Sequence, residues 1–151
     1  MRKLVLFLFL VMMLLSSCKH RTLYNSFYSM PMNGWHQDSV LCYAVDMSAA
    51  GCCDVLLTVR HTMDYPYQNL WLFVDEYVDS VLIQQDTVEA MLADDYGRWL
   101  GNGYYRYELS LLYDEDYCFS ESSQYTFSIR QGMRSDWLQG ITDVGLKVIR
   151  K

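Results

Sequence analysis

Apolar and polar residues alternate with a period of two through most of the chain after Ser39. Alternating runs cover 41–47, 55–61, 125–130 and 144–148. Successive side chains of a β-strand point to opposite faces, so strict alternation predicts strands with one buried face and one face in water. The last two runs show this alternation most cleanly.

Three other regions depart from simple alternation. Residues 70–74 are continuously apolar, which predicts a strand that is buried on both faces or covered by a loop. Residues 81–85 and 87–93 predict a hairpin pair of strands. Residues 105–113 predict a further strand, separated from its predecessor by Gly101-Asn102-Gly103.

No window of about a dozen residues shows the i, i+3, i+4, i+7 apolar spacing of an amphipathic helix. The one helical signal is a single turn over 135–139, with Ser135 as its cap. About seven to nine short strands with frequent turn signals predict an all-β fold, an antiparallel β-sandwich or jelly roll, over 39–151. The length of 151 residues allows one such domain and leaves little room for two.

The N-terminus predicts a secretory signal peptide over 1–17. Met1-Arg2-Lys3 precedes an apolar run over 4–15, which is too short for the roughly 20 residues of a membrane-spanning helix. Leu15-Ser16-Ser17-Cys18 then resembles the lipobox of bacterial lipoproteins. In that motif the Cys18 thiol is the nucleophile that takes a diacylglyceryl group before cleavage. An ordinary secreted protein with a chance cysteine is the alternative.

The segment 18–38 is predicted to hold the lipidated cysteine and a tether that leads into the domain. Acyl chains such as palmitate would hold the protein on a membrane, because each buried CH₂ contributes about 0.8 kcal/mol. Lys19, His20 and Arg21 follow at once and could touch lipid phosphates. No acidic run follows Cys18, which favours an anchor facing the periplasm, with the outer membrane favoured over the inner one.

The composition and net charge of the chain argue against two classes of protein, disordered chains and nucleic-acid-binding proteins. Apolar residues make up 52% and charged residues 20%, which excludes a disordered chain. Thirteen Tyr against two Pro suit pleated strands. The net charge of −6 argues against a nucleic-acid partner, because phosphate binding needs a basic face.

The predicted domain contains four cysteines, Cys42, Cys52, Cys53 and Cys118. An oxidising compartment permits a disulfide, and four cysteines allow three pairings, so the pairing stays open beside the alternative of free thiols. Neighbouring Cys52 and Cys53 cannot easily reach disulfide geometry with each other. Their spacing to His36 and His61 matches no zinc signature, and neither a metal nor a cofactor is predicted.

Several segments together resemble a family. They are Met-Asn-Gly-Trp at 32–35, Arg-His-Thr at 60–62, Tyr-Pro-Tyr-Gln-Asn-Leu-Trp-Leu at 65–72, the run 92–101, Tyr-Thr-Phe-Ser-Ile-Arg-Gln-Gly-Met at 125–133, and the run 140–148. They are similar to the gliding-motility lipoprotein GldH family, over about residues 30–149. The resemblance implies a cell-envelope lipoprotein associated with gliding movement, and no known catalytic activity.

Two motifs in these segments could carry chemistry. Asp94-Asp95 could be an acid–base pair or calcium ligands, but adjacent strand residues point to opposite faces, so a turn in which Asp caps backbone N–H groups is favoured. Arg98 beside Trp99 could be a structural pair, stacked on an aromatic ring or bound to one of these aspartates. The alternative is a partner-binding patch, where Trp, Tyr and Arg are the usual anchors.

The loop before the apolar run is the other candidate. Tyr65, Tyr67, Gln68 and Asn69 offer flat rings for stacking and amides for hydroxyl groups, as a sugar-binding face requires. The four tryptophans, Trp35, Trp71, Trp99 and Trp137, could add platforms, although Trp71 and Trp99 could equally be core. Arg130 is a further candidate for binding a partner or ligand.

Two functions are compatible with these residues. The first is a non-enzymatic assembly lipoprotein that docks onto other envelope proteins through exposed Tyr, Trp and Arg; the family resemblance favours it. The alternative is a glycan-binding module for envelope polysaccharide. No nucleophile motif, phosphate loop or dinucleotide fingerprint predicts an enzyme, and His61 is interpreted as a strand or loop-edge histidine.

Overall fold

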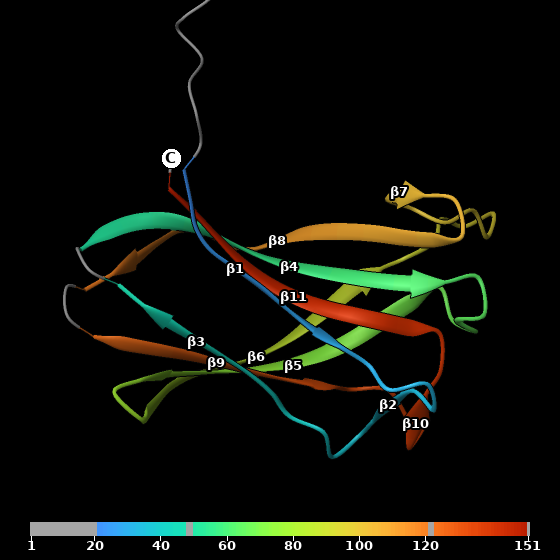
Figure 1. Cartoon of the computed structure of the whole chain (residues 1–151), viewed down its shortest axis with the longest axis horizontal. Coiled ribbons are helices and arrows are strands. Elements are labelled where there is room, and N and C mark those ends of the chain that lie inside the picture. Colours follow the sequence, from blue (N-terminus) through green and yellow to red (C-terminus); the bar gives the residue numbers. More distant parts are fainter. Residues whose placement is uncertain (1–20, 48–49, 121–122, 151) are drawn as a thin grey trace, which may run out of the picture.

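The computed structural model describes residues 21–47, 50–120 and 123–150, and these ranges form eleven strands and no helix. Nine strands build two antiparallel sheets that lie face to face (Figure 1). The predicted all-β fold of the β-sandwich type is confirmed. No helix in the described ranges is long and apolar enough to cross a membrane, and the predicted signal peptide and Cys18 lie outside these ranges.

The first sheet has five strands in the order β1 (Arg21–Ser29), β11 (Ile141–Arg150), β4 (Gly51–Thr62), β8 (Arg106–Phe119) and β7 (Asn102–Gly103). The second has four, β3 (Leu41–Asp46), β9 (Gln124–Gln131), β5 (Asn69–Val78) and β6 (Val81–Met91). A two-stranded ribbon of β2 (Trp35–His36) and β10 (Trp137–Leu138) lies at one end.

The structure differs from the predicted tether over 18–38, because residues 21–29 form the edge strand β1. Tyr24 and Phe27 pair with Val148 and Gly145 of β11. Gly145 makes the close approach possible, since a Cβ there would lie 2.5 Å from the Phe27 ring. The Arg60 guanidinium covers the same ring at 4.0 Å from its centroid. The segment is therefore part of the sheet.

Three local predictions are also corrected. Residues 81–91 form the single strand β6 along all of β5, rather than two strands of a hairpin. The hairpin prediction was wrong because β6 is an edge strand, in which most residues are exposed and show no clean alternation. The predicted helical turn at 135–139 is strand β10, whose Trp137 pairs with His36. Strand β4 begins at Gly51, ahead of the alternating run predicted over 55–61.

The core lies between the two sheets and follows the alternation. Val55, Leu57 and Val59 of β4 are all 0% exposed, and they face the inward side chains of the second sheet. Tyr43 of β3 is also fully buried, and its hydroxyl donates to the Val144 carbonyl of β11 at 2.7 Å. This bond ties one sheet to the other along one side of the sandwich.

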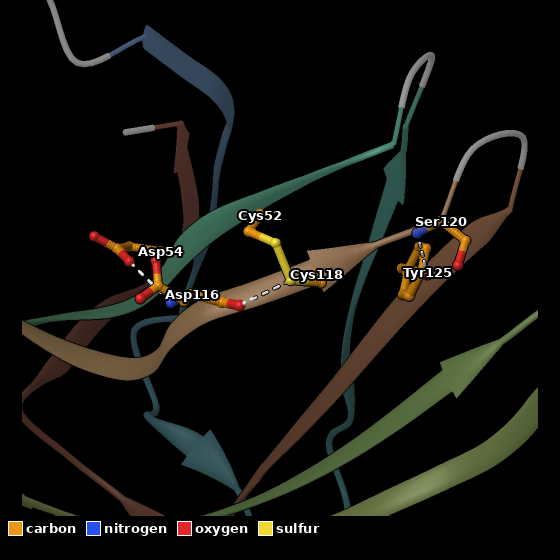
Figure 2. The surroundings of a disulfide bond; sticks show 6 residues. All are labelled: Cys52, Asp54, Asp116, Cys118, Ser120 and Tyr125. Atoms are coloured by element: carbon orange, nitrogen blue, oxygen red, sulfur yellow. Dashed lines mark hydrogen bonds between the residues drawn. A yellow bond between two sulfur atoms is a disulfide. The ribbon is translucent and has the colours of Figure 1, made fainter.

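A disulfide between Cys52 of β4 and Cys118 of β8 resolves the open cysteine pairing (Figure 2). The two residues are direct partners in the ladder, with Cα atoms 4.0 Å apart. The register between β4 and β8 shifts just beyond the pair, and Asp116 has a positive φ of 58° there. The disulfide therefore fixes the register of an irregular stretch. Cys42 and Cys53 are free thiols.

A buried carboxyl group ties the sheets together along the other side. The Glu76 side chain of β5 is 1% exposed. The Tyr113 hydroxyl of β8 lies 2.5 Å from Glu76 Oε1 and 2.6 Å from Asp86 Oδ2 of β6. A phenol has one proton to donate, so these two contacts need a second proton from a carboxyl group. Burial, with Asp86 and Asp114 nearby, raises the pKa of Glu76. We assign the second proton to Glu76.

Replacement of Glu76 by Gln tests this assignment. The raised pKa means that folding favours protonated Glu76, so its contribution to stability falls as pH rises from below 4.5 through the folded-state pKa. Gln keeps the shape and stays neutral. We expect the free energy of unfolding of Glu76→Gln, measured by denaturant titration, to exceed that of the wild type at pH 8 by on the order of 1 kcal/mol. This advantage should shrink towards pH 4.5.

Glu89→Gln is the control, because Glu89 is exposed and the substitution removes the same charge. The stability of this variant relative to the wild type should show no such dependence on pH. An advantage of Glu76→Gln that grows on acidification would contradict the assignment. Because both measurements compare each variant with the wild type at the same pH, the titration of other groups cancels.

Candidate functional site

The segments that carry the family resemblance converge at one end of the sandwich. The Thr62 N–H donates to the Gly140 carbonyl at 2.8 Å. The Gln68 carbonyl accepts the N–H groups of Leu92 and Ala93 at 2.7 and 3.0 Å. We call this end, which carries β2, β7 and β10, the loop end (Figure 1).

The chain enters the domain at the opposite end. Strand β1 begins at Arg21, which pairs with Arg150, and Arg150 pairs with Cys53 near the start of β4. Strand β4 then runs the length of the sandwich to Thr62 at the loop end. A membrane anchor that precedes residue 21 would therefore attach at the end of the sandwich opposite the loop end.

A buried aromatic cluster supports the loop end. The His61 ring is fully buried, with its centroid 4.5 Å from that of Trp99, 5.6 Å from Tyr107 and 6.0 Å from Tyr65. Burial lowers the pKa of His61, so the ring is neutral at pH 7. Tyr65 is 2% exposed and donates its hydroxyl to the Asn69 carbonyl at 2.7 Å. Tyr65 and His61 thus serve packing, and Trp99 is half-buried against them.

Asp94 organises the turn that follows. Its Oδ1 accepts the N–H groups of Tyr96 and Arg98 at 3.0 and 2.9 Å, and its Oδ2 accepts Arg98 Nε–H at 2.7 Å. The hydrogen bond from the Arg98 N–H is the main reason that the pKa of Asp94 is lowered. The predicted Asp-capped turn is present. Arg98 also lies over the Tyr96 ring, so its contacts are local.

The turn presents exposed tyrosines. Tyr96 is 85% exposed, and Tyr104 and Tyr105 are 83% and 77% exposed. Leu100 lies between them in sequence and is 37% exposed. We call residues 94–105 the tyrosine loop. Its backbone is fixed by the Asp94 turn, by the Ala93–Trp99 bridge and by β7, which pairs with β8, so the exposed rings stand on an ordered support.

A second surface lies on the outer face of the four-stranded sheet. On β5, Leu70, Leu72 and Val74 are fully buried, whereas Trp71 and Phe73 point outwards and are 37% and 38% exposed. The prediction of a strand buried on both faces is therefore corrected. Only the side facing the other sheet is fully buried, and the outer rings are covered in part, with the Arg130 guanidinium over the Phe73 ring at 5.9 Å from its centroid and the Met133 side chain beside Trp71.

These rings form part of a groove of about 450 Å³, which we call the outer groove. Its lining consists of Tyr67, Asn69, Trp71, Phe73, Thr87, Gly132, Met133 and Arg134. Of the residues predicted to bind, Tyr67 and Asn69 line the groove. Gln68 donates to the Asp94 carbonyl at 3.4 Å. Arg130 pairs with Asp75 at 3.3 Å beside Phe73 and is not in the lining.

The sequence analysis missed Phe73, Met133 and Arg134 as candidates, and treated Trp71 as either a platform or core. The resemblance segments 65–72 and 125–133 contained the available signal, since they form the two walls of the groove. No group of three or more His, Cys, Asp or Glu side chains that could hold a metal occurs within the described ranges.

Comparison with known proteins gives a consistent result. A family model described as GldH lipoprotein matches residues 22–148. The chain is 32% identical to a gliding motility lipoprotein GldH homolog of Christiangramia forsetii, over 95% of this chain and 92% of that protein. It is 30% identical to the gliding motility lipoprotein GldH of Flavobacterium johnsoniae, over 95% and 94%.

Likeness to solved structures is weak. A family 35 carbohydrate binding module from Clostridium thermocellum gives a TM-score of 0.40 at 10% identity, over 81% of this chain and 90% of that one. Eiger TNF from S. frugiperda gives 0.36 at 8% identity, over 87% and 94%. Neither score supports an argument about ligand or partner.

The geometry predicts unequal roles for Trp99 and Arg98. Trp99→Ala removes a half-buried ring from the His61 cluster, and we expect a loss of roughly 2 kcal/mol in the free energy of unfolding. Arg98→Ala removes an exposed ion pair and should leave the free energy of unfolding nearly unchanged. Chemical denaturation of both variants measures this. Equal losses would mean that the two residues act as one structural pair.

Proposed function

The chain belongs to the GldH lipoprotein family, and from that membership we propose that it is a non-enzymatic assembly component of the cell envelope. In this role a lipid anchor holds the domain on a membrane while the loop end docks onto another envelope protein. Membership supports a gliding-motility-associated lipoprotein attached to a membrane. The docking role, the site of lipidation and the orientation are our proposals.

The proposed anchor is Cys18, exposed as the first residue when the signal peptide 1–17 is removed. The lipobox-like Leu15-Ser16-Ser17-Cys18 supports this assignment. The absence of an acidic run in the sequence after Cys18 supports a periplasm-facing anchor, and we favour the outer membrane. Attachment to a surface raises the effective concentration of the domain near its partners, so that a docking patch of modest affinity suffices.

The observation that carries the docking proposal is the tyrosine loop. This loop carries three strongly exposed tyrosines, and its strand β7 lies at the end of the sandwich away from the start of β1. Tyrosine rings supply large contact areas at a low cost in conformational entropy, and they are enriched at interfaces. A membrane anchor ahead of β1 would leave this loop pointing away from the lipid, where another protein can reach it.

The carboxyl and imidazole groups whose pKa values are shifted support a binding role over catalysis. His61 is buried and neutral, and Asp94 is held by three hydrogen bonds in its turn. Glu76 lies between the sheets and is 1% exposed. Each of these groups is engaged in holding the fold, and none of the three is presented to a substrate from the described surface.

The test is affinity purification of mildly cross-linked lipoprotein from solubilised envelopes, followed by mass spectrometry. We expect a reproducible set of envelope proteins with the wild type, and loss of that set with Tyr104→Ala/Tyr105→Ala at an unchanged melting temperature. The Cys18→Ser variant should be found outside the membrane fraction, or should retain its signal peptide.

Ile83→Ala is the control, because Ile83 is 52% exposed and lies on β6 beside the β5–β6 turn, at the end of the sandwich opposite the loop end. The docking proposal fails if the tyrosine variant retains the full set of partners, or if both variants lose it equally. The anchor proposal fails if Cys18→Ser still partitions into detergent at the mature size.

A further inference from the structure

We propose that the outer groove is a binding site for an acidic saccharide, a sugar that carries a carboxylate. This site is distinct from the tyrosine loop and goes beyond the assembly role. The groove combines stacking rings, neutral hydrogen-bonding groups and one uncompensated positive charge, and each of these features corresponds to part of such a ligand.

The stacking platform consists of Trp71 and Phe73. The two residues are two positions apart on β5 and point to the same face, so their Cα atoms are separated by about 6.6 Å along the strand. Each ring is a little over one-third exposed, because the sheet supports it from below. A sugar ring needs only one accessible aromatic face for its C–H groups, so partly exposed rings on a rigid sheet suit it.

Residues 131–133 form the wall of the groove opposite these rings, and hydrogen bonds within the protein hold this wall in place. The Gly132 N–H donates to the Trp71 carbonyl at 2.7 Å, and Gln131 Nε2 donates to the Ser135 carbonyl at 2.8 Å. Gln131 Oε1 also accepts the Met133 N–H at 2.8 Å. A Cβ at residue 132 would lie 3.1 Å from the Phe73 ring, so glycine lets this wall approach the platform closely.

The electrostatics of the groove favour an anion. Arg134 has no carboxylate within 4.0 Å among the described residues. Of the acidic groups on the same sheet, Asp75 pairs with Arg130, and Glu89, which accepts a hydrogen bond from the neutral Asn69 amide, is not in the lining of the groove. A bound carboxylate would therefore meet a guanidinium that has no competing partner, and such charge-assisted hydrogen bonds are strong.

The backbone around the groove favours a saccharide over an extended peptide. Strand β5 pairs with β6 on one side and with β9 on the other, and the bond from Gly132 continues this cover to Trp71. A peptide strand would find no free ladder here, whereas a sugar needs only side chains. Hydroxyl and amide groups of Tyr67, Asn69 and Thr87 flank the rings, and a volume of about 450 Å³ lies within the range of small-ligand sites.

Isothermal titration calorimetry of the detergent-solubilised mature lipoprotein tests the proposal, with trigalacturonate and its fully methyl-esterified form as probes. The two ligands share their rings and differ in charge. We expect saturable binding of the acid and at least tenfold weaker binding of the ester. Arg134→Gln should weaken binding of the acid by at least tenfold and leave binding of the ester unchanged. Trp71→Ala should weaken binding of both ligands.

Lys147→Gln and Trp137→Ala are the controls, because they remove a positive charge and a tryptophan ring outside the groove, and both variants should bind the acid within about twofold of the wild type. Thermal melting of each variant verifies that it is folded. No saturable heat with trigalacturonate, equal binding of the ester, or unchanged binding by Arg134→Gln would overturn the proposal. These outcomes leave the tyrosine-loop experiment unaffected, so the two proposals fail separately.

Discussion

Burial of alternating apolar side chains between two sheets is the constraint on which the rest of the molecule depends. Val55, Leu57 and Val59 of β4 have no exposed surface, and the inward residues of β5 pack against the same core. Because the side-chain period of a strand is two, this burial turns the intervening residues outwards. Trp71 and Phe73 reach the outer face for that reason, and the outer groove is a consequence of how β5 fills the core.

The same packing gives the domain two different ends. The start of β1, the end of β11 and the Cys52–Cys118 disulfide lie at the end where the chain enters, and the disulfide fixes an irregular part of the β4–β8 ladder there. The loop end carries the buried His61 cluster and the exposed tyrosine loop. In the proposed role this separation matters, because an anchor ahead of β1 would attach at the entry end and leave the loop end accessible.

The sequence predicts the parts of this structure that depend on strand periodicity and turn chemistry. The runs 125–130 and 144–148 and the Asp94 turn are examples. It fails where tertiary contacts decide the outcome: β1 becomes a strand because Phe27 fits over Gly145, and exposed β6 shows no clean alternation. In the candidate site, Tyr67 and Asn69 could be predicted from a loop pattern. Arg134 could not, because its place opposite Trp71 depends on the hydrogen bond between Gly132 and Trp71, which are 61 residues apart in sequence.

Docking of the loop end onto an envelope protein should be visible in hydrogen–deuterium exchange of the lipoprotein in native envelopes, compared with the detergent-purified protein. We expect slower amide exchange in the envelope over 94–105, and no change at the β5–β6 turn near Ile83, which lies at the other end. Equal exchange over 94–105 in both samples, or protection confined to the turn near Ile83, would contradict the docking proposal.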